Sequence, residues 1–420
     1  MRILFLNNVF PPHVMGGYEI ACSNVAAALH ARGHQIEVLV GHAPIATPEE
    51  PPYLHRALML RAFDPVSPHT SELADAKTYE AASSQYANTA TLLTHLRRFS
   101  PDLVYVWHVW GVGGLAMLDL LDQVGIPWVM HLMDCIPTYL LNGVVPVAAA
   151  LFSRDNTAVF TRAHVITMSE QIITEIADTC GVRFDIPPSV IPGWVNADGL
   201  TQRARYSERG HLRLVSAGSL GVHKGTDVIV QACGRLIDEG YRTFHVDIYG
   251  FGWPEPWVAM AAQLGAQEHI TFHNALTQPE LLAVLPEYDA FLFPTQNREP
   301  FGFVPIEAAA CGAVPIVTRN AGVAERLVDG VHALKIDRTP ESLATAIRRL
   351  LTGDADVAAI GRRAARLVRS DLSFTRCLDD IERVLQKAAV PWDPSRLDDP
   401  RLPAILFAKH ALGQHLTAYR

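Results

Sequence analysis

Residues 290–317 read AFLFPTQNREPFGFVPIEAAACGAVPIV. Two short apolar stretches, 290–293 and 314–317, have the length and composition of buried strands. Between them, Pro305 can occupy the first position of a helix, a place that proline favours. A strand, a helix and a second strand in this order are typical of a parallel sheet covered by helices.

The same alternation extends over most of the chain. In the first half we expect strands at 2–6, 36–40, 103–106, 128–131 and 165–168, a helix over 18–31 that Gly33 ends, and another helix over 71–99. In the second half we expect strands at 212–217, 244–249, 270–272, 290–293, 314–317 and 333–336, with helices between them. A last helix is expected over 373–388.

The two series of strands are separated by a segment with the composition of a linker. Residues 187–196 are rich in proline and glycine, and residues 201–209 are polar. We therefore predict an α/β protein with two Rossmann-like domains, residues 1–195 and 196–372, that face each other across a cleft. Ligands of such sheets bind at the carboxyl ends of the strands, so both domains are expected to direct loops into the cleft.

The composition excludes several classes of protein. The 420 residues are 49% hydrophobic and 19% charged, which fits a packed chain rather than a disordered one. A formal net charge of -8 argues against nucleic acid as a partner. The six cysteines form no Cys-x-x-Cys pair, so we expect neither a zinc ribbon nor a disulfide framework, as in a reducing compartment.

Targeting signals and membrane spans are not expected either. The N-terminus turns polar too soon for a signal peptide, and the uncharged stretch 103–118 is shorter than the roughly 20 residues of a spanning helix. We expect a cytoplasmic protein. Peripheral contact at the inner face of a membrane and a subunit contact stay open, because the tail, 391–420, could form an apolar stripe. The alternative is that this stripe covers the protein's own surface.

Two carboxylates, Glu299 and Glu307, are the strongest candidates for a functional site. Glu299 follows the strand that ends at Phe293, and Glu307 lies just inside the next helix. Both can accept paired hydrogen bonds from neighbouring hydroxyls, while backbone N–H groups at the helix start can bind phosphate. Gly302 permits close approach of a ligand. The alternative for Glu307 is an acidic residue that only complements the helix dipole.

This string resembles the donor-site motif of the retaining family 4 glycosyltransferases, which have the GT-B fold. Further similar motifs are Gly16-Gly17 with Glu19, Val190-Ile-Pro-Gly-Trp-Val-Asn196, Gly218-Ser-Leu-Gly-Val-His-Lys-Gly225, Tyr249-Gly-Phe-Gly252 and Gly322-Val-Ala-Glu325. They occur in the family's order and span some nine tenths of the chain. The resemblance implies that the N-terminal domain binds the acceptor and the C-terminal domain the donor. It also implies that segment 373–420 returns to the N-terminal domain as a helix and a tail.

The resemblance also implies roles for single residues. Lys224 is expected to hold the donor diphosphate, Glu299 to bind the transferred sugar, and Glu307 to bind the ribose; for Lys224 the alternative is a solvated loop lysine. The expected donor-binding set is Gly16, Gly17, Ser219, His223, Lys224, Gly250, Glu299, Phe301, Gly302, Phe303, Val304 and Glu307. The chain departs from the family at Ser219, where an arginine is usual. His223 and Arg298 are candidates to supply that positive charge.

On the acceptor side, the segment Trp128-Val-Met-His-Leu-Met-Asp134 ends a strand. By resemblance, His131 is a catalytic candidate next to the transferred sugar, together with Lys224 and Glu299, and Asp134 is an acceptor contact. The alternative for His131 is a histidine satisfied within the core. His108 also follows a strand, and we interpret it as a loop histidine.

These features predict a retaining glycosyltransferase that moves a sugar from a nucleoside diphosphate sugar to an acceptor hydroxyl by a front-face mechanism. No metal and no cofactor besides this co-substrate are expected, because lysine and helix N-termini can stabilise the leaving diphosphate. The alternatives are another GT-B enzyme, either a nucleotide-sugar epimerase or a phosphorolytic enzyme, and a non-catalytic sugar-nucleotide-binding protein. The sequence does not identify the base, the sugar, the oligomeric state or the acceptor, which can be a saccharide, a lipid-linked molecule or a small molecule.

Overall fold

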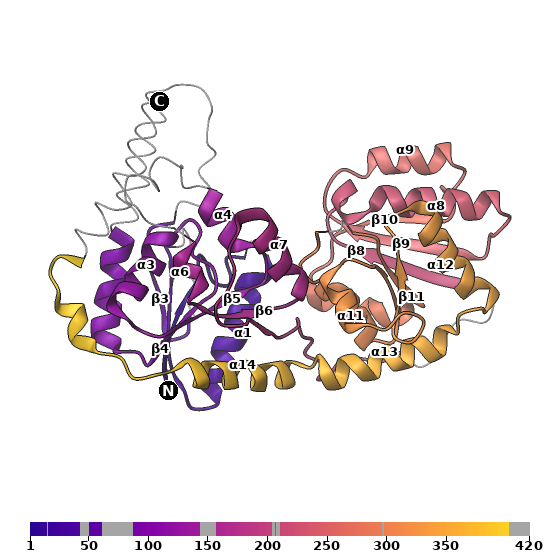
Figure 1. Cartoon of the computed structure of the whole chain (residues 1–420). Helices are drawn as coiled ribbons and strands as arrows, with labels where there is room; N and C mark the ends of the chain where they lie inside the picture. The colour runs from indigo at the N-terminus through magenta and orange to yellow at the C-terminus, as the bar shows by residue number, and fades with distance from the viewer. Residues whose placement is uncertain are drawn as a thin grey trace, which may run out of the picture. The chain divides into compact units, whose positions relative to one another are not determined.

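The computed structural model describes residues 1–14, 16–42, 50–60, 87–142, 157–203, 206, 211–295 and 298–402. Contacts divide the chain into two compact units (Figure 1). Unit 1 comprises Met1–Thr167, Ile172–Val190 and Asp380–Arg420, and unit 2 comprises Met168–Gln171 and Ile191–Asp379. The apolar tail stripe from Leu406 onward and most of the expected helix at 71–99 lie outside the described residues.

Unit 1 contains a parallel seven-stranded sheet with the order β3-β2-β1-β4-β5-β6-β7. Its strands are β1 (Arg2–Leu6), β2 (Gln35–Gly41), β3 (Leu54–Leu58), β4 (Leu103–Val106), β5 (Trp128–Leu132), β6 (His164–Thr167) and β7 (Ser189–Val190). The five strands expected from the sequence are present. The two edge strands were not expected, because β7 has two residues and β3 carries histidine and arginine within an otherwise apolar run.

The helices of unit 1 lie between these strands. They are α1 (Gly17–Ala31), a helix over residues 87–99, α3 (Leu115–Val124), α4 (Ile136–Asn142), α6 (Ala158–Thr161) and α7 (Glu170–Cys180). α1 confirms the helix expected over 18–31, and Gly33 follows its end with a φ of 89°, a left-handed conformation that favours glycine. At its start, the N–H of Gly16 donates to Glu19 Oε2 at 2.8 Å, which satisfies one free donor of the helix end.

Unit 2 contains a parallel six-stranded sheet with the order β10-β9-β8-β11-β12-β13. The strands are β8 (Leu212–Ala217), β9 (Phe244–Gly250), β10 (Ile270–Asn274), β11 (Ala290–Phe293), β12 (Val314–Thr318) and β13 (Leu334–Ile336). All six were expected from the sequence. β11 and β12 are buried along their whole length, so they read as continuous apolar runs.

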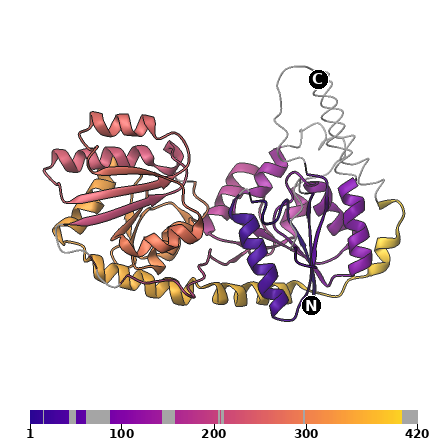
Figure 2. The ribbon, with the colours of Figure 1, turned by 180° about the vertical axis from the view of Figure 1, so that it is seen from behind.

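Helices cover both faces of the sheet in unit 2. α8 (Thr226–Asp238), α9 (Glu255–Gln263) and α12 (Pro340–Thr352) lie on one face, and α11 (Phe303–Ala310) and α13 (Val357–Asp371) lie on the other (Figures 1 and 2). The remaining elements are α10 (Gln278–Val284) and the 3-10 helices η1 (Val222–Lys224), η2 (Leu285–Glu287) and η3 (Gly322–Arg326). The predicted fold class, two parallel α/β units, is confirmed. Within the described ranges, every helix is too short or too polar to cross a membrane.

The last part of the described chain runs through both units. α14 (Phe374–Ala388) begins in unit 2, and residues from Asp380 onward are grouped with unit 1. Glu382 of this helix pairs with Arg32 at 2.5 Å and His34 at 2.9 Å, both beyond the end of α1. Trp392 Nε1 donates to the carbonyl of Pro101 at 3.0 Å. Residues 403–420 lie outside the described residues, so these contacts end at η4 (Pro394–Asp398) and the residues that follow it.

The tight turn between η1 and α8 yields a prediction for stability. Gly225 has a φ of 78°, and a Cβ there would lie 2.0 Å from the carbonyl oxygen of Pro294. Gly225→Ala should therefore lower the free energy of unfolding by about 3 kcal/mol, because the backbone must move. Gly240→Ala is the control, since its φ is 90° and its Cβ meets nothing within 4 Å. Urea denaturation measures both, and equal losses would contradict the prediction.

Candidate active site

Two glycine-containing loops meet at the carboxyl edge of β8 and β9. The N–H of Gly218 donates to the carbonyl of Tyr249 at 3.0 Å, and that of Leu220 donates to the carbonyl of Phe251 at 2.9 Å. A Cβ at Gly250 would lie 2.3 Å from the carbonyl oxygen of Gly218, so glycine is required for this approach. A small pocket in this loop is lined by residues 216–220 together with Lys224, Thr226, Ile248 and Phe293.

Lys224 and Glu299, both predicted to bind the donor, form an ion pair in this region. Lys224 Nζ lies 2.6 Å from Glu299 Oε2, and their side chains are 34% and 17% exposed. The hydroxyl of Thr295 donates to the same carboxylate oxygen at 2.9 Å. The lysine comes from the loop after β8 and the glutamate from the loop after β11, neighbouring strands in the sheet. The pair holds an ammonium and a carboxylate at the edge where an anionic, hydroxylated ligand can reach both.

Glu307 lies on α11 and is nearly buried. Its side chain accepts a hydrogen bond from Gln278 Nε2 at 2.5 Å. Burial raises the pKa of the carboxyl group, and the hydrogen bond from Gln278 opposes this increase. α11 begins at Phe303, so Pro305 is its third residue rather than its first, as the sequence had suggested. The proline still lies within the first turn, where a backbone N–H has no partner in the helix.

The start of α11 brings several predicted donor-binding residues together. Gly302 precedes the helix with a φ of 103°, and a Cβ there would lie 2.8 Å from the ring of Phe293. Phe301 is buried, and its ring meets that of Phe303 edge to face at 5.8 Å. The phenylalanine rings therefore support the turn, and the backbone N–H groups of the first helical turn are the groups that can face an anion.

Ser219 occupies the position where the family usually has arginine. Its hydroxyl lies 2.7 Å from His223 Nε2, so the two side chains hydrogen-bond to each other in the segment between β8 and α8. Arg298, the other candidate for the missing charge, is exposed. A further cation, Arg338, which the sequence did not suggest, donates to the carbonyl of Val222 and lies 3.4 Å from Asp227. The Arg338 guanidinium therefore binds the backbone of η1 at its first residue, Val222.

Two further residues of the site were missed by the sequence analysis. Thr295 lies directly after β11, where loops of such sheets meet ligands, and this position was a usable signal. Gln278 lies at the start of α10, which a capping box of Thr277 and Glu280 marks. The capping pattern predicts the helix start, but only the tertiary structure shows that the Gln278 side chain reaches Glu307.

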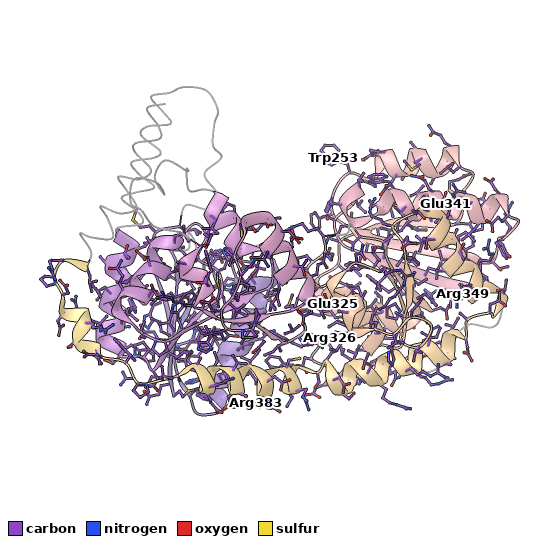
Figure 3. All side chains as sticks on the ribbon, viewed as in Figure 1. Trp253, Glu325, Arg326, Glu341, Arg349 and Arg383 are labelled. Atoms are coloured by element: carbon purple, nitrogen blue, oxygen red, sulfur yellow. The ribbon has the colours of Figure 1, made fainter. Side chains whose placement is uncertain are left out.

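The remaining family-like motif, at 322–325, contacts residues 170 and 171, which are grouped with unit 2. Glu325, which Figure 3 labels, accepts with Oε2 from the N–H of Glu170 and with Oε1 from that of Gln171, both at 2.9 Å. A Cβ at Gly322 would lie 2.0 Å from the carbonyl oxygen of Pro300. This motif therefore joins the loop after β12 to the loop that carries Glu299, and its role within unit 2 is structural.

In unit 1, the predicted loop Gly16-Gly17 leads into α1 beside the end of β5. The hydroxyl of Tyr18 accepts hydrogen bonds from the N–H groups of Met133 at 2.7 Å and Asp134 at 3.0 Å. Burial raises the pKa of Tyr18, and the negative charge of Asp134 raises it further, so the hydroxyl keeps its proton. Asp134 thus lies next to the glycine loop, at the carboxyl edge of the sheet.

His131 lies inside the sheet rather than at its edge. Its side chain is fully buried, Nδ1 is 2.6 Å from the hydroxyl of Tyr105, and its ring stacks on Trp107 at 4.2 Å. Burial lowers its pKa to about 3. Burial and ring stacking favour the alternative that the sequence left open, a histidine of the core. A role beside the transferred sugar stays a prediction, and it requires the ring to leave this position.

The burial of His131 predicts how stability depends on pH. Its pKa falls from an ordinary 6.5 to about 3 on folding, so the unfolded chain binds the proton more tightly. The stabilisation is complete above pH 6.5 and is lost as the pH falls toward 3, about 2 kcal/mol between pH 7 and 5. Urea denaturation at both pH values should show this loss. His131→Gln should show a smaller pH dependence, and an identical dependence in both proteins would contradict the assignment.

Comparisons with known proteins agree with this architecture. The family model of glycosyl transferases group 1 matches residues 202–367, and that of the glycosyl transferase 4-like domain matches residues 16–193. Glycogen synthase of Mycobacterium tuberculosis is 27% identical over 429 residues, which cover 98% of this chain and 99% of that protein. A GDP-mannose-dependent alpha-(1-6)-phosphatidylinositol monomannoside mannosyltransferase of Mycolicibacterium smegmatis is 31% identical over 170 residues, 38% of this chain and 44% of that protein.

Solved structures show the same fold. Sucrose-phosphate synthase from Thermosynechococcus elongatus has a TM-score of 0.67 at 17% identity, over 92% of this chain and 99% of that one. The fold and the two matching models define the class of protein, a glycosyltransferase with the GT-B fold. The chain belongs to glycosyltransferase family 4. Among the alternatives that the sequence left open, the comparisons thus favour the glycosyltransferase.

Proposed function

We propose that this glycosyltransferase moves a sugar from a nucleoside diphosphate sugar to an acceptor hydroxyl, with retention of configuration and without a metal ion. The observation that carries the proposal is the ion pair of Lys224 and Glu299, which Thr295 supports at the carboxyl edge of the unit 2 sheet. A cation for the diphosphate and a carboxylate for sugar hydroxyls are thereby held next to each other. The mycolicibacterial relative is named as a GDP-mannose-dependent enzyme, which supports a donor of this class.

The donor diphosphate is assigned to the loop between β8 and α8 and to the start of α11. Lys224 supplies a point charge, and the backbone N–H groups after Gly302 supply donors at a helix N-terminus. In the described structure the ammonium of Lys224 is neutralised by Glu299. Donor binding then exchanges this contact for two new ones, phosphate on the lysine and sugar hydroxyls on the glutamate. The ion pair thus holds both side chains in place before the donor binds.

The nucleoside is assigned to Glu307. Its carboxylate is nearly buried and is oriented by Gln278, so its remaining oxygen lone pairs can accept both hydroxyls of a ribose. The base is left open, since the described contacts select none. A thermal-shift comparison of ADP-glucose, UDP-glucose and GDP-mannose identifies it, because a ligand at 100 times its Kd stabilises the protein by about 2.7 kcal/mol.

The reaction proceeds on one face of the sugar. The bond between the anomeric carbon and the diphosphate oxygen breaks, and the acceptor oxygen forms a bond to the same carbon from the same side. The proton of the acceptor hydroxyl passes to the leaving phosphate oxygen, so no protein carboxylate needs to act as a nucleophile. Lys224 and the helix N-terminus stabilise the negative charge that develops on the diphosphate. Asp134, on the acceptor side, binds an acceptor hydroxyl.

The two glutamates are predicted to differ in what they bind. Glu307→Ala should weaken the binding of the free nucleoside diphosphate and of the donor alike, by about 1.5–3 kcal/mol for a charged hydrogen bond. Glu299→Ala should lower turnover and leave nucleoside diphosphate affinity nearly unchanged, since its partner is the sugar. Calorimetric titration separates the two, with Glu268→Ala, an exposed carboxylate of unit 2, as the control. Equal losses of affinity in both variants would show that the roles are wrongly assigned.

Charge on the diphosphate gives a second prediction. Lys224→Ala should lower the rate of transfer by about 10²-fold or more, because its charge matters most as the leaving group departs. Ser219→Arg should be tolerated or raise donor affinity, whereas His223→Ala should produce a smaller loss than Lys224→Ala. Lys335→Ala, on edge strand β13, serves as the control. Wild-type transfer rates in the Lys224 variant would refute the phosphate site, and activity that EDTA abolishes would refute the metal-free route.

A further inference from the structure

The sheet of unit 1 has a topological switch point between β1 and β4. The strand order runs from β1 outward to β2 and β3 on one side and to β4, β5, β6 and β7 on the other. In open α/β sheets, ligands bind outside the carboxyl ends of the strands at this place, because the crossover connections diverge there. The loops that follow β4 and β5 carry His108 and Asp134, and the loop after β1 leads into α1, whose second residue is Tyr18.

His108 is the residue at this switch point whose environment calls for a ligand. Its side chain is only 8% exposed, and among the described residues no hydrogen-bond partner lies within reach of its Nδ1 atom, which is buried. A buried polar atom without a partner costs about 1–3 kcal/mol, so native proteins retain few of them without a functional reason.

The surroundings of His108 have the chemistry of a site for an uncharged, hydroxylated ring. The edge of its imidazole meets the ring of Tyr18 at 5.0 Å, and Trp110, 47% exposed, lies 6.4 Å away between ring centroids. The indole offers a flat apolar surface, and Asp134 offers carboxylate oxygens that can accept from hydroxyls. This carboxylate disfavours an anionic ligand.

The protonation state of His108 fits such a ligand. Burial lowers its pKa to about 4, although the negative charge of Asp134 acts in the opposite direction. At neutral pH the imidazole is therefore uncharged, with one nitrogen that donates and one that accepts. A hydroxyl group also donates and accepts, so a neutral histidine is a suitable partner for the oxygen of a sugar or cyclic polyol.

We propose that His108, together with Tyr18, Trp110 and Asp134, binds the sugar or cyclic polyol ring of the acceptor, with His108 hydrogen-bonded to one of its hydroxyls. This inference rests on the proposed function, because it names the acceptor class of the same reaction. It gives His108, which the sequence analysis interpreted as a loop histidine, a contact with the acceptor. The residues belong to unit 1 alone, so the site does not depend on the donor-binding residues.

The experiment uses the full-length protein and the donor that the thermal-shift comparison selects. Maltotriose, methyl α-D-mannopyranoside and myo-inositol serve as acceptor probes. Transfer to each probe, hydrolysis of the donor by water, and calorimetric affinity for the nucleoside diphosphate are measured for wild type, His108→Ala, His108→Gln and Trp110→Ala. His42→Ala is the control, because His42 also follows a strand of this sheet but is exposed and lies after β2.

We expect His108→Ala to lower kcat/KM for the acceptor about tenfold or more, because a hydrogen bond to a substrate hydroxyl is lost. The rate of donor hydrolysis and the affinity for the nucleoside diphosphate should stay unchanged. His108→Gln, which keeps a donor and an acceptor, should recover part of the loss. Trp110→Ala should raise KM for the acceptor, and since Trp110 is exposed, this variant tests the site even if a His108 variant does not fold.

The outcomes separate this inference from the proposed function. If His108→Ala and Trp110→Ala transfer sugar to the acceptor as fast as wild type, the proposed acceptor site is overturned, whereas the proposed donor site is unaffected. If these variants lose both transfer activity and affinity for the nucleoside diphosphate, the acceptor site is overturned as well, because the residues would then act through the fold. If wild type neither binds a nucleoside diphosphate nor hydrolyses any donor, the proposed function itself is refuted, and the acceptor site with it.

Discussion

The parallel arrangement of the strands is the constraint on which the rest of the structure depends. Parallel neighbours require a crossover for each pair, and these crossovers place every loop that follows a strand at the same edge of the sheet. In unit 2 this brings the loops after β8 and β11 together, although Lys224 and Glu299 are 75 positions apart in the chain. In unit 1 it brings Tyr18, His108 and Asp134 to one edge.

The three charged residues proposed to bind the donor, Lys224, Glu299 and Glu307, occupy two different environments, and this difference fits the different roles proposed for them. Lys224 and Glu299 are partly exposed and neutralise each other, so a ligand can separate them at a small cost in free energy. Glu307 is nearly buried and depends on the amide of Gln278, so its carboxylate is fixed in orientation. A fixed carboxylate suits a group that stays in place during the reaction, such as a ribose. An ion pair that a ligand can separate suits the sugar and the phosphate, because these two groups separate during the reaction.

Two histidines show what the sequence left open. His108 and His131 both lie at or near the end of a central strand, and the family resemblance drew attention to His131. The structure shows that His131 lies within β5 and is enclosed by Tyr105 and Trp107, while His108 lies beyond β4 with a buried nitrogen that lacks a partner among the described residues. Strand ends are known from sequence only to within a residue or two, and such a shift moves a side chain from the edge to the interior.

The sequence by itself determined the fold class, both sheets except their edge strands, and the positions of Glu299, Glu307 and Lys224, because apolar periodicity, glycine and proline act locally. Edge strand β3 was not predicted, because its histidine and arginine break the apolar pattern. Only the tertiary structure decided which side chains meet: Lys224 with Glu299, Gln278 with Glu307, Ser219 with His223. The first two pairs join residues on different loops and helices, and burial, which lowers the pKa of His108 and of His131, exists only once the chain has packed.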